Sequence, residues 1–223
     1  MITLLLIILL ISYLTYRKAF YSPLNKRSTT HLLPDTPQYR KANPVIRKLI
    51  DEMEKVPYEQ VYITSYDGTK LAAKYYHISD SAPLQIQFHG YRSTAIRDFS
   101  GGFQLAQKMG RNTLVVDQRA NGKSGGTTIT FGIKEKYDCL EWIKYAVDRF
   151  GNIPIMLTGV SMGGATVLMA SELDLPENVK CIVSDCPYTS PYEIIAGERR
   201  VKASKMAGLT TIPAIIRDFN DIV

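Results

Sequence analysis

Cysteine is scarce in this chain of 223 residues, which has three, Cys139, Cys181 and Cys186. An odd number of cysteines cannot all pair within one molecule, and their neighbours are apolar stretches rather than the closely spaced ligand pairs of zinc sites. A disulfide scaffold and a zinc centre are therefore excluded, and the three side chains are interpreted as small buried apolar groups. Internal repeats and low-complexity tracts are also missing. With 45% hydrophobic and 22% charged residues, the composition is that of an ordinary folded protein.

Histidine is equally rare, and His31, His77 and His89 all lie in the first part of the chain. A loop with glycines at phosphate-binding spacing after a strand is missing as well, which disfavours a nucleotide enzyme. The net charge of +6 comes from 27 basic and 21 acidic side chains spread along the chain. Because the basic pairs lack interleaved aromatic residues, this charge favours an anionic membrane surface over nucleic acid. We expect no nucleic-acid partner, no metal and no cofactor.

What the sequence does have is a long apolar run at its N-terminus. Residues 2–14 read ITLLLIILLISYL, and Arg17 and Lys18 follow. A helix of about 16 residues that includes this run rises about 24 Å, short of the roughly 30 Å hydrocarbon core, so spanning requires local thinning or snorkelling by these two side chains. A secretory signal peptide has a run of this length but needs preceding basic residues and a small-residue cleavage site, and neither is present. We expect an uncleaved single-pass anchor over residues 1–18. Its basic flank puts the rest of the chain on the cytoplasmic side of the cell membrane.

The remainder is predicted to be a linker and one domain. Residues 19–43 are polar and contain several prolines, which is typical of a linker that lifts a domain off the membrane. The domain covers residues 44–223, enough for a single hydrophobic core. It begins with a helix over residues 44–55, for which Asn43 is the expected N-cap and Pro44 suits the first turn.

Strands and helices then alternate along the domain. A hairpin is predicted around Asp67-Gly68, and after it come apolar strands separated by helices with one apolar face. The pattern indicates an α/β fold: a mostly parallel sheet with an antiparallel N-terminal hairpin and helices on both faces. The predicted strands cover residues 61–65, 71–77, 84–88, 113–116, 155–157 and 181–184, and the predicted helices cover residues 99–109, 134–150 and 161–171.

Ser161 is the strongest candidate for a catalytic side chain. Residues 159–163 read GVSMG, between an apolar strand and a helix of small residues. In such a strand–turn–helix, the two glycines leave room for a sharp turn that exposes the serine hydroxyl above the sheet. The amide of Met162, at the start of the helix, points to the same place and can stabilise an oxyanion.

A second oxyanion donor is expected from the loop after the strand at residues 84–88. Gly90 would let the backbone turn so that the Tyr91 amide faces the Ser161 oxygen. His89, in the same loop, precedes the nucleophile. It is interpreted as a loop-stabilising residue, with a role as catalytic base as the less favoured alternative.

Three segments together resemble the α/β-hydrolase superfamily, in particular its serine aminopeptidase and lysophospholipase-like branch, which includes membrane-anchored bacterial members. They are FHGYRS at 88–93, DQRANGKSGG at 117–126 and GVSMGGATVLMAS at 159–171. The resemblance covers roughly residues 45–200. It implies the α/β-hydrolase fold, Ser161 as nucleophile and the Tyr91 and Met162 amides as oxyanion hole. It also implies an acid and a histidine that follow the nucleophile in the chain.

No histidine follows Ser161 in this chain. Residues 190–193 resemble a capping box, and a basic amphipathic helix is predicted from residue 191 to 207, so a cap begins near residue 190. The last two strands, which in the family carry the acid and the histidine, have no counterpart. We therefore expect a member truncated at its C-terminus and lacking the last strands of the sheet. Asp185, at the end of its strand, is either the catalytic acid or the residue that orders the turn at Cys186.

Two functional hypotheses follow. The first is a serine hydrolase that cleaves an ester or related acyl bond of a small-molecule or lipid-like substrate through a Ser161 acyl-enzyme, impaired because the base is missing. The second is a catalytically inactive hydrolase scaffold that acts as a binding protein or is a non-functional fragment.

Overall fold

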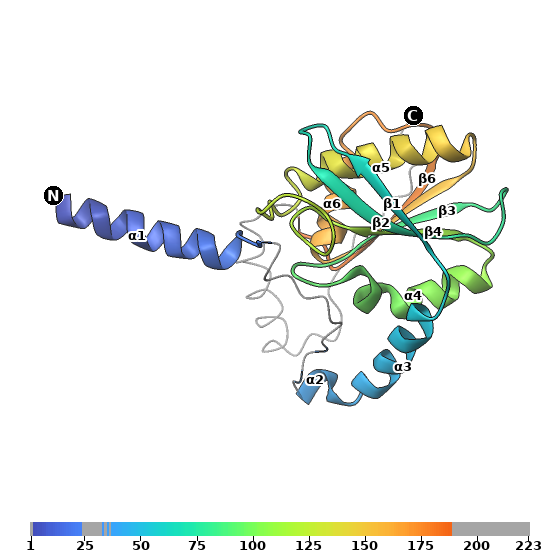
Figure 1. Ribbon diagram of the computed structural model, residues 1–223, viewed down its shortest axis with the longest axis horizontal. Coiled ribbons are helices and arrows are strands. Elements are labelled where there is room, and N and C mark those ends of the chain that lie inside the picture. Colours follow the sequence, from blue (N-terminus) through green and yellow to red (C-terminus); the bar gives the residue numbers. More distant parts are fainter. Residues whose placement is uncertain (1, 24–32, 34, 36, 189–223) are drawn as a thin grey trace, which may run out of the picture.

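The structure is a computed structural model that describes residues 2–23, 33, 35 and 37–188 (Figure 1). A long N-terminal helix projects from a domain in which strands and helices alternate. The helices are α1 (Ile2–Ala19), α2 (Pro37–Arg40), α3 (Asn43–Glu54), α4 (Ala95–Lys108), α5 (Glu135–Phe150) and α6 (Met162–Ala170). The strands are β1 (Glu59–Thr64), β2 (Lys70–Tyr76), β3 (Leu84–Phe88), β4 (Asn112–Asp117), β5 (Ile155–Val160) and β6 (Val179–Asp185).

The strands form one sheet in the order β1-β2-β4-β3-β5-β6. Strands β1 and β2 pair antiparallel and β2 pairs antiparallel with β4, whereas β4, β3, β5 and β6 are parallel to one another. All five residues of β3 are buried, as expected for a central parallel strand. The prediction of a mostly parallel sheet with an antiparallel hairpin is confirmed.

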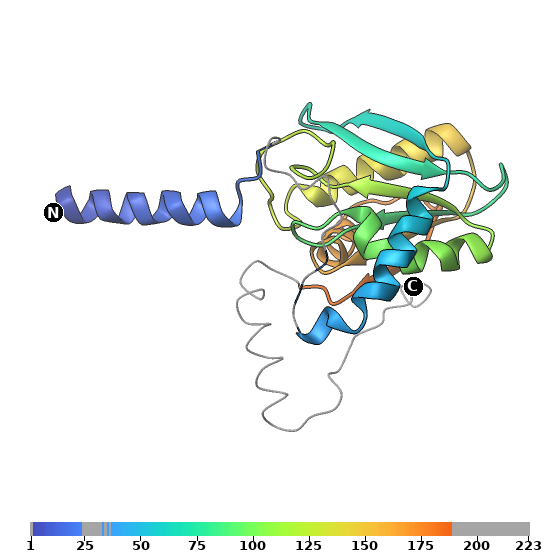
Figure 2. The ribbon, with the colours of Figure 1, turned by 60° about the horizontal axis from the view of Figure 1, so that its bottom comes forward.

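Helices cover both faces of the sheet (Figures 1 and 2). On one face α5 and α6 pack on the strands, and the side chains of Cys139, Trp142 and Ile143 are fully buried there. On the other face α3 and α4 form a separate core around Met53 and Phe103. The apolar faces of α3 and α5 could be predicted from the sequence, because their apolar residues recur at helical spacing.

Two helix starts differ from the prediction. The helix predicted over residues 99–109 begins at Ala95, because the Thr94 hydroxyl caps it by accepting a hydrogen bond from the Arg97 amide at 3.3 Å. Ile96 extends the apolar stripe one turn before Phe99. Asn43 is wrong as an N-cap: it is the first helical residue, and Ala42 occupies the cap position. The cap helix predicted over residues 191–207 lies outside the described residues.

The cysteines were only partly predicted. Cys139 is buried, but Cys181 and Cys186 are exposed. Within residues 37–188, β6 is one of the two edge strands of the sheet, and its residues are exposed or only partly buried. Cys181 therefore lies on a strand without a neighbour on one side among these residues, and this explains why its side chain is exposed rather than buried.

Helix α1 has no buried residue and a mean hydropathy of 1.6. By length and composition it qualifies as a membrane span, although an N-terminal signal sequence passes the same test. The residues that follow do not stand clear of the domain: the Ser22 amide donates to the Thr127 carbonyl at 2.8 Å, and the Ile129 amide donates to the Phe20 carbonyl at 2.9 Å. The first part of the predicted linker thus lies against the domain.

Candidate active site

Ser161 lies on a sharp turn between β5 and α6, with φ 53° and ψ −112°. This backbone conformation is rare for a residue with a side chain, and it persists only where the surroundings enforce it. The neighbouring glycines explain how the turn fits. A Cβ atom at Gly159 would overlap the Gly163 carbonyl, and a Cβ atom at Gly163 would overlap the carbonyl of Phe88. The tight strand–turn–helix expected for a nucleophile elbow is present.

Backbone hydrogen bonds fix this turn in place. The Ser161 amide donates to the Asp185 carbonyl at 2.8 Å, and the Ser161 carbonyl accepts from the Ala165 amide at 3.0 Å. Met162 is the first residue of α6 and its side chain is fully buried. Amides in the first turn of a helix have no acceptor within the helix, so the Met162 amide is available to an oxyanion.

The loop after β3 runs directly beside Ser161. A Cβ atom added at Gly90 would lie 3.4 Å from the Ser161 Cβ, so this backbone lies in van der Waals range of the elbow. Tyr91, the second predicted oxyanion donor, follows at once. The structure therefore brings Ser161, Met162 and Tyr91 together at the carboxyl edge of the sheet.

Asp98 is a positioning residue that the sequence did not reveal. Its carboxylate accepts from the Gly90 amide at 2.8 Å and from the Ser93 hydroxyl at 2.5 Å. These two bonds span the loop that carries Tyr91. An acid in the first turn of a helix is a common stabiliser, and the helix start at Ala95 was placed too late to show it.

His89 is a structural residue. It is fully buried, its Nδ1 lies 2.8 Å from the Gly90 carbonyl, and its Nε2 accepts from the Gln118 amide at 3.2 Å. Because one nitrogen faces an acceptor and the other a donor, both are used within the loop and neither serves Ser161. The preferred interpretation of His89 agrees with this geometry.

The other histidine within the described residues lies far from the site. His77 follows β2, and because β2 is antiparallel to β4, its end lies at the sheet edge opposite to Ser161. His31 is outside the described residues. Asp185 holds the elbow through its backbone carbonyl, and its carboxylate accepts a hydrogen bond from the Cys186 thiol at 3.2 Å. This contact fits an ordering role, and a catalytic role for Asp185 remains a prediction.

A second loop, residues 127–132, forms an aromatic wall next to the elbow. Phe131 stacks on Tyr91 with ring centroids 5.1 Å apart and packs with Tyr188. The carboxylate of Glu135, which is 1% exposed, holds the loop by accepting from the Thr130 amide, the Thr130 hydroxyl and the Gly132 amide at 2.6 to 2.8 Å. Glu135 was not predicted either, since its partners are neighbouring backbone groups rather than a recognisable motif.

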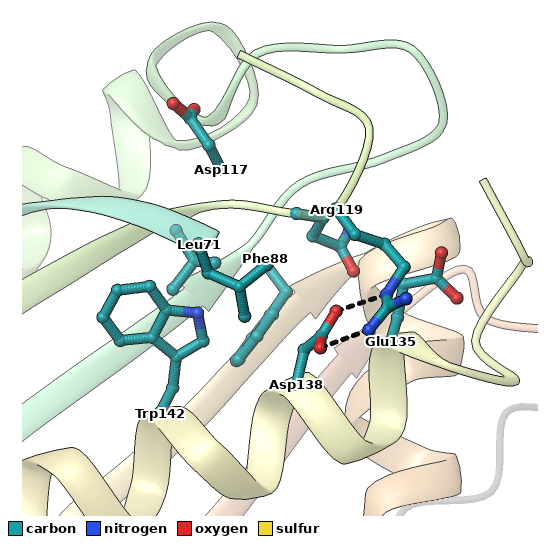
Figure 3. A pocket seen from close by; sticks show the side chains of 9 residues that line it. Leu71, Phe88, Asp117, Arg119, Glu135, Asp138 and Trp142 are labelled. Atoms are coloured by element: carbon teal, nitrogen blue, oxygen red, sulfur yellow. Dashed lines mark hydrogen bonds and ion pairs between the residues drawn. The ribbon is translucent and has the colours of Figure 1, made fainter. Parts of the chain in front are cut away.

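Behind this loop a buried ion pair ties α5 to the loop after β4 (Figure 3). Two nitrogens of Arg119 each lie 2.6 Å from an oxygen of Asp138, and a third nitrogen donates to Asp67 at 2.9 Å. Desolvation opposes the charge on Arg119, but the hydrogen bonds that it donates to both carboxylates outweigh this effect and raise the pKa of the guanidinium. The group is therefore a permanently charged structural link. Within the described residues no cluster of three or more His, Cys, Asp or Glu residues could hold a metal ion.

Comparisons with known proteins agree with this geometry. The uncharacterized protein YqkD of Bacillus subtilis is 25% identical over 155 residues, covering 68% of this chain and 49% of YqkD. The solved structure of a Pyrococcus furiosus esterase superposes with a TM-score of 0.58 at 25% identity, over 80% of this chain and 63% of the esterase. The chain thus spans about half the length of YqkD and less than two thirds of the esterase.

A short stretch has different relatives. Over 30 residues the chain is 67% identical to a probable plasmid-partitioning protein ParB of Xylella fastidiosa. The match covers 14% of this chain and 8% of that protein. It is too small a share of either chain to define a fold.

The family model of the alpha/beta hydrolase fold matches residues 93–214, more than half of the sequence. The match spans Asp98 in the first turn of α4, the aromatic loop and the elbow at Ser161. The chain belongs to the alpha/beta hydrolase fold family.

Proposed function

We propose that the chain carries the acyl-transfer site of a serine hydrolase, with Ser161 as nucleophile. The observation that supports this most is the strained elbow, where the Ser161 side chain is partly exposed between two sources of backbone amides. The likeness to a Pyrococcus furiosus esterase favours esters or related acyl compounds as substrates.

The proposed reaction starts with attack of the Ser161 oxygen on the carbonyl carbon of the ester. The oxyanion that forms would accept hydrogen bonds from the Tyr91 and Met162 amides. Collapse of the tetrahedral intermediate expels the alcohol and leaves an acyl group on Ser161, which water then removes. Both steps need a base to take a proton, first from the serine and then from water.

The 223-residue chain has no imidazole to supply that base after Ser161. Loss of the base in serine hydrolases costs about 10⁴ to 10⁶ in turnover, while the oxyanion hole and binding retain about 10³ over water. We therefore propose that this chain is a slow catalyst whose nucleophile still reacts with activated acyl and phosphonyl compounds.

A fluorophosphonate probe tests this proposal. The purified chain is incubated with the probe, with and without free imidazole as a substitute base, and the modified residue is mapped by mass spectrometry. We expect slow labelling at Ser161, accelerated by imidazole and lost in Ser161→Ala. Ser171→Ala, at the other end of α6, is the matched control and should label like the parent. No labelling at Ser161 under either condition contradicts the proposal and favours an inactive scaffold.

We further propose that α1 is a membrane anchor with the domain on the cytoplasmic side, as the basic residues Arg17 and Lys18 after the apolar run favour. Proteolysis of inverted and right-side-out vesicles tests the orientation. The short likeness to partitioning proteins covers at most 13% of any of them, so we propose no role in DNA partitioning from it.

A further inference from the structure

The end of helix α1 is capped by the loop that carries Tyr91. Carbonyls in the last turn of a helix lack partners within the helix. Here the Lys18 carbonyl accepts from Arg92 Nη2 at 2.8 Å, and the Ala19 carbonyl accepts from the Tyr91 hydroxyl at 2.7 Å. The helix and the proposed oxyanion loop are therefore joined directly, without a spacer.

A second contact joins the same end of α1 to the aromatic loop. Tyr21 forms an antiparallel bridge with Thr128, and the hydroxyls of Tyr16 and Thr128 lie 2.8 Å apart. Phe20 packs edge-on against Phe131, with ring centroids 5.3 Å apart. Two loops that flank Ser161 thus hold the helix end from two sides.

The rings at this junction form one continuous apolar surface beside the nucleophile. We call Phe20, Tyr91, Phe131 and Tyr188 the aromatic rim. Tyr91, Phe131 and Tyr188 pack around the buried side chain of Met162, which is next to Ser161 in the chain. The aromatic rim therefore reaches from the end of α1 to the elbow.

The remainder of α1 points away from the domain in both views (Figures 1 and 2). It has no buried residue, and its large apolar side chains from Ile2 to Leu14 are exposed on every side. A bilayer is the occupant that fits: the apolar part from Ile2 to Leu14 rises about 20 Å, which enters the hydrocarbon core with local thinning, and a helix apolar all round suits lipid rather than one protein groove. Arg17, Lys18 and Arg92 lie at the junction, where lipid headgroups would be.

We infer that α1 holds the carboxyl edge of the sheet against the bilayer surface, so that acyl amphiphiles reach Ser161 from the membrane interface with their chains along the aromatic rim. The substrate class in this inference rests on the proposed function of Ser161, whereas the orientation of the domain against the bilayer does not. A domain on a free linker would instead present all of its faces to the membrane.

The geometry is tested by fluorescence quenching in nanodiscs. In a Cys181→Ser, Cys186→Ser background, one fluorophore is attached at Ile133→Cys, an exposed position in the loop between β4 and α5, and in a second variant at Ser81→Cys, at the opposite edge. Cys139 is buried and stays unlabelled. Because the six residues of β4 separate the two edges by about 20 Å, headgroup nitroxides should quench the label at Ile133→Cys about twofold or more over the label at Ser81→Cys. Equal quenching, or stronger quenching at Ser81→Cys, overturns the inference.

Two variants separate orientation from anchoring. A flexible Gly-Ser insert of about ten residues between Leu14 and Thr15 keeps the apolar part of the anchor and leaves residues 16–21 on the domain, where Tyr16, Lys18 and Ala19 contact its loops, but removes the rigid helix between the two. Arg92→Ala removes the hydrogen bonds to Lys18 and Tyr21 together with the contact of the guanidinium with the Tyr91 ring, and it protects the test against misfolding of the insert. Both variants should stay in the nanodisc fraction. The quenching ratio should fall towards one in the insert and fall partly in Arg92→Ala; an unchanged ratio in the insert contradicts the inferred joint.

The substrate class is tested with two fluorophosphonates in the same nanodiscs, one with a long alkyl chain and one with an ethyl group, both with imidazole. We expect faster labelling of Ser161 by the long-chain probe, and loss of that preference in the insert. Labelling by both probes without a preference refutes the membrane route and leaves the nucleophile intact. No labelling by either probe refutes the proposed function, while the quenching ratio still decides the geometry.

Discussion

Replacement of Glu135 measures how firmly the aromatic loop is held beside the elbow. Its carboxylate is buried and accepts three hydrogen bonds, two from backbone amides and one from the Thr130 hydroxyl. In Glu135→Gln one terminal atom becomes an NH₂ group, which cannot accept, so at least one amide of the loop loses its partner. The cost is about 1 to 3 kcal/mol. Glu135→Ala loses all three bonds and leaves a cavity, for a cost of about 4 to 5 kcal/mol.

The assay is urea unfolding of the full chain in detergent micelles, followed by tryptophan fluorescence. Trp142 is the chain's single tryptophan, is fully buried and lies on the same helix as Glu135. Glu141→Gln is the matched control, because Glu141 makes only a surface pair with Lys144 and should change the free energy of unfolding by less than about 0.5 kcal/mol. If Glu135→Gln is as harmless as Glu141→Gln, the loop is not held by this carboxylate and the reasoning is refuted.

Three further perturbations test the packing around the site. Gly163→Ala places a Cβ against the Phe88 carbonyl and should lower the free energy of unfolding by more than about 4 kcal/mol or prevent folding. Gly110 has open space around it and φ +66°, so Gly110→Ala is the control and should cost about 1 kcal/mol. Similar losses of stability in the two variants would contradict the close packing of the elbow. Arg119→Leu leaves the carboxylates of Asp67 and Asp138 without their guanidinium partner and should lower the free energy of unfolding in urea by about 3 to 5 kcal/mol. A loss below about 1 kcal/mol would show that the ion pair of Arg119 and Asp138 is not structural. Burial opposes the charge on Asp67, but the hydrogen bond from Arg119 lowers the pKa of Asp67 below the unfolded value of about 3.9. The stability that the ionised Asp67 contributes to the fold is therefore fully present above that pH and is lost as the pH falls further. The stability gap between the parent and Asp67→Asn should therefore narrow below about pH 4, and a gap that does not change with pH would refute the assignment.

The elements of the fold could be predicted from the sequence because each has a clear local pattern. Strand β3 is an uninterrupted buried stretch, and α5 repeats its apolar residues at helical spacing. The order of the strands was not predictable in this way. Strand β4 lies between β2 and β3, and nothing local to these segments encodes that pairing, which depends on contacts between distant parts of the chain.

The candidate site, too, could be predicted where a local motif marks a residue and could not be predicted where distant residues meet. The positions of Ser161, Met162 and Tyr91 beside one another could be predicted because the roles proposed for them depend on short motifs with a fixed backbone geometry. Asp98 acts across a loop eight residues from Gly90, and no motif marks that distance. The contact between Phe20 and the loop at Ile129 was hidden for the same reason, since proline-containing residues after an anchor are typical of a linker whether or not they lie on the domain.

The central claim is that Ser161 is a nucleophile in this chain, and the most direct test is to trap its acyl-enzyme. Without a base, removal of the acyl group by water is slower than its transfer from an activated ester. After incubation with p-nitrophenyl butyrate, intact mass and peptide mapping should show one butyryl group per chain, on Ser161, and none in Ser161→Ala. Butyryl groups scattered over lysines, or equal modification of Ser161→Ala, would contradict the account.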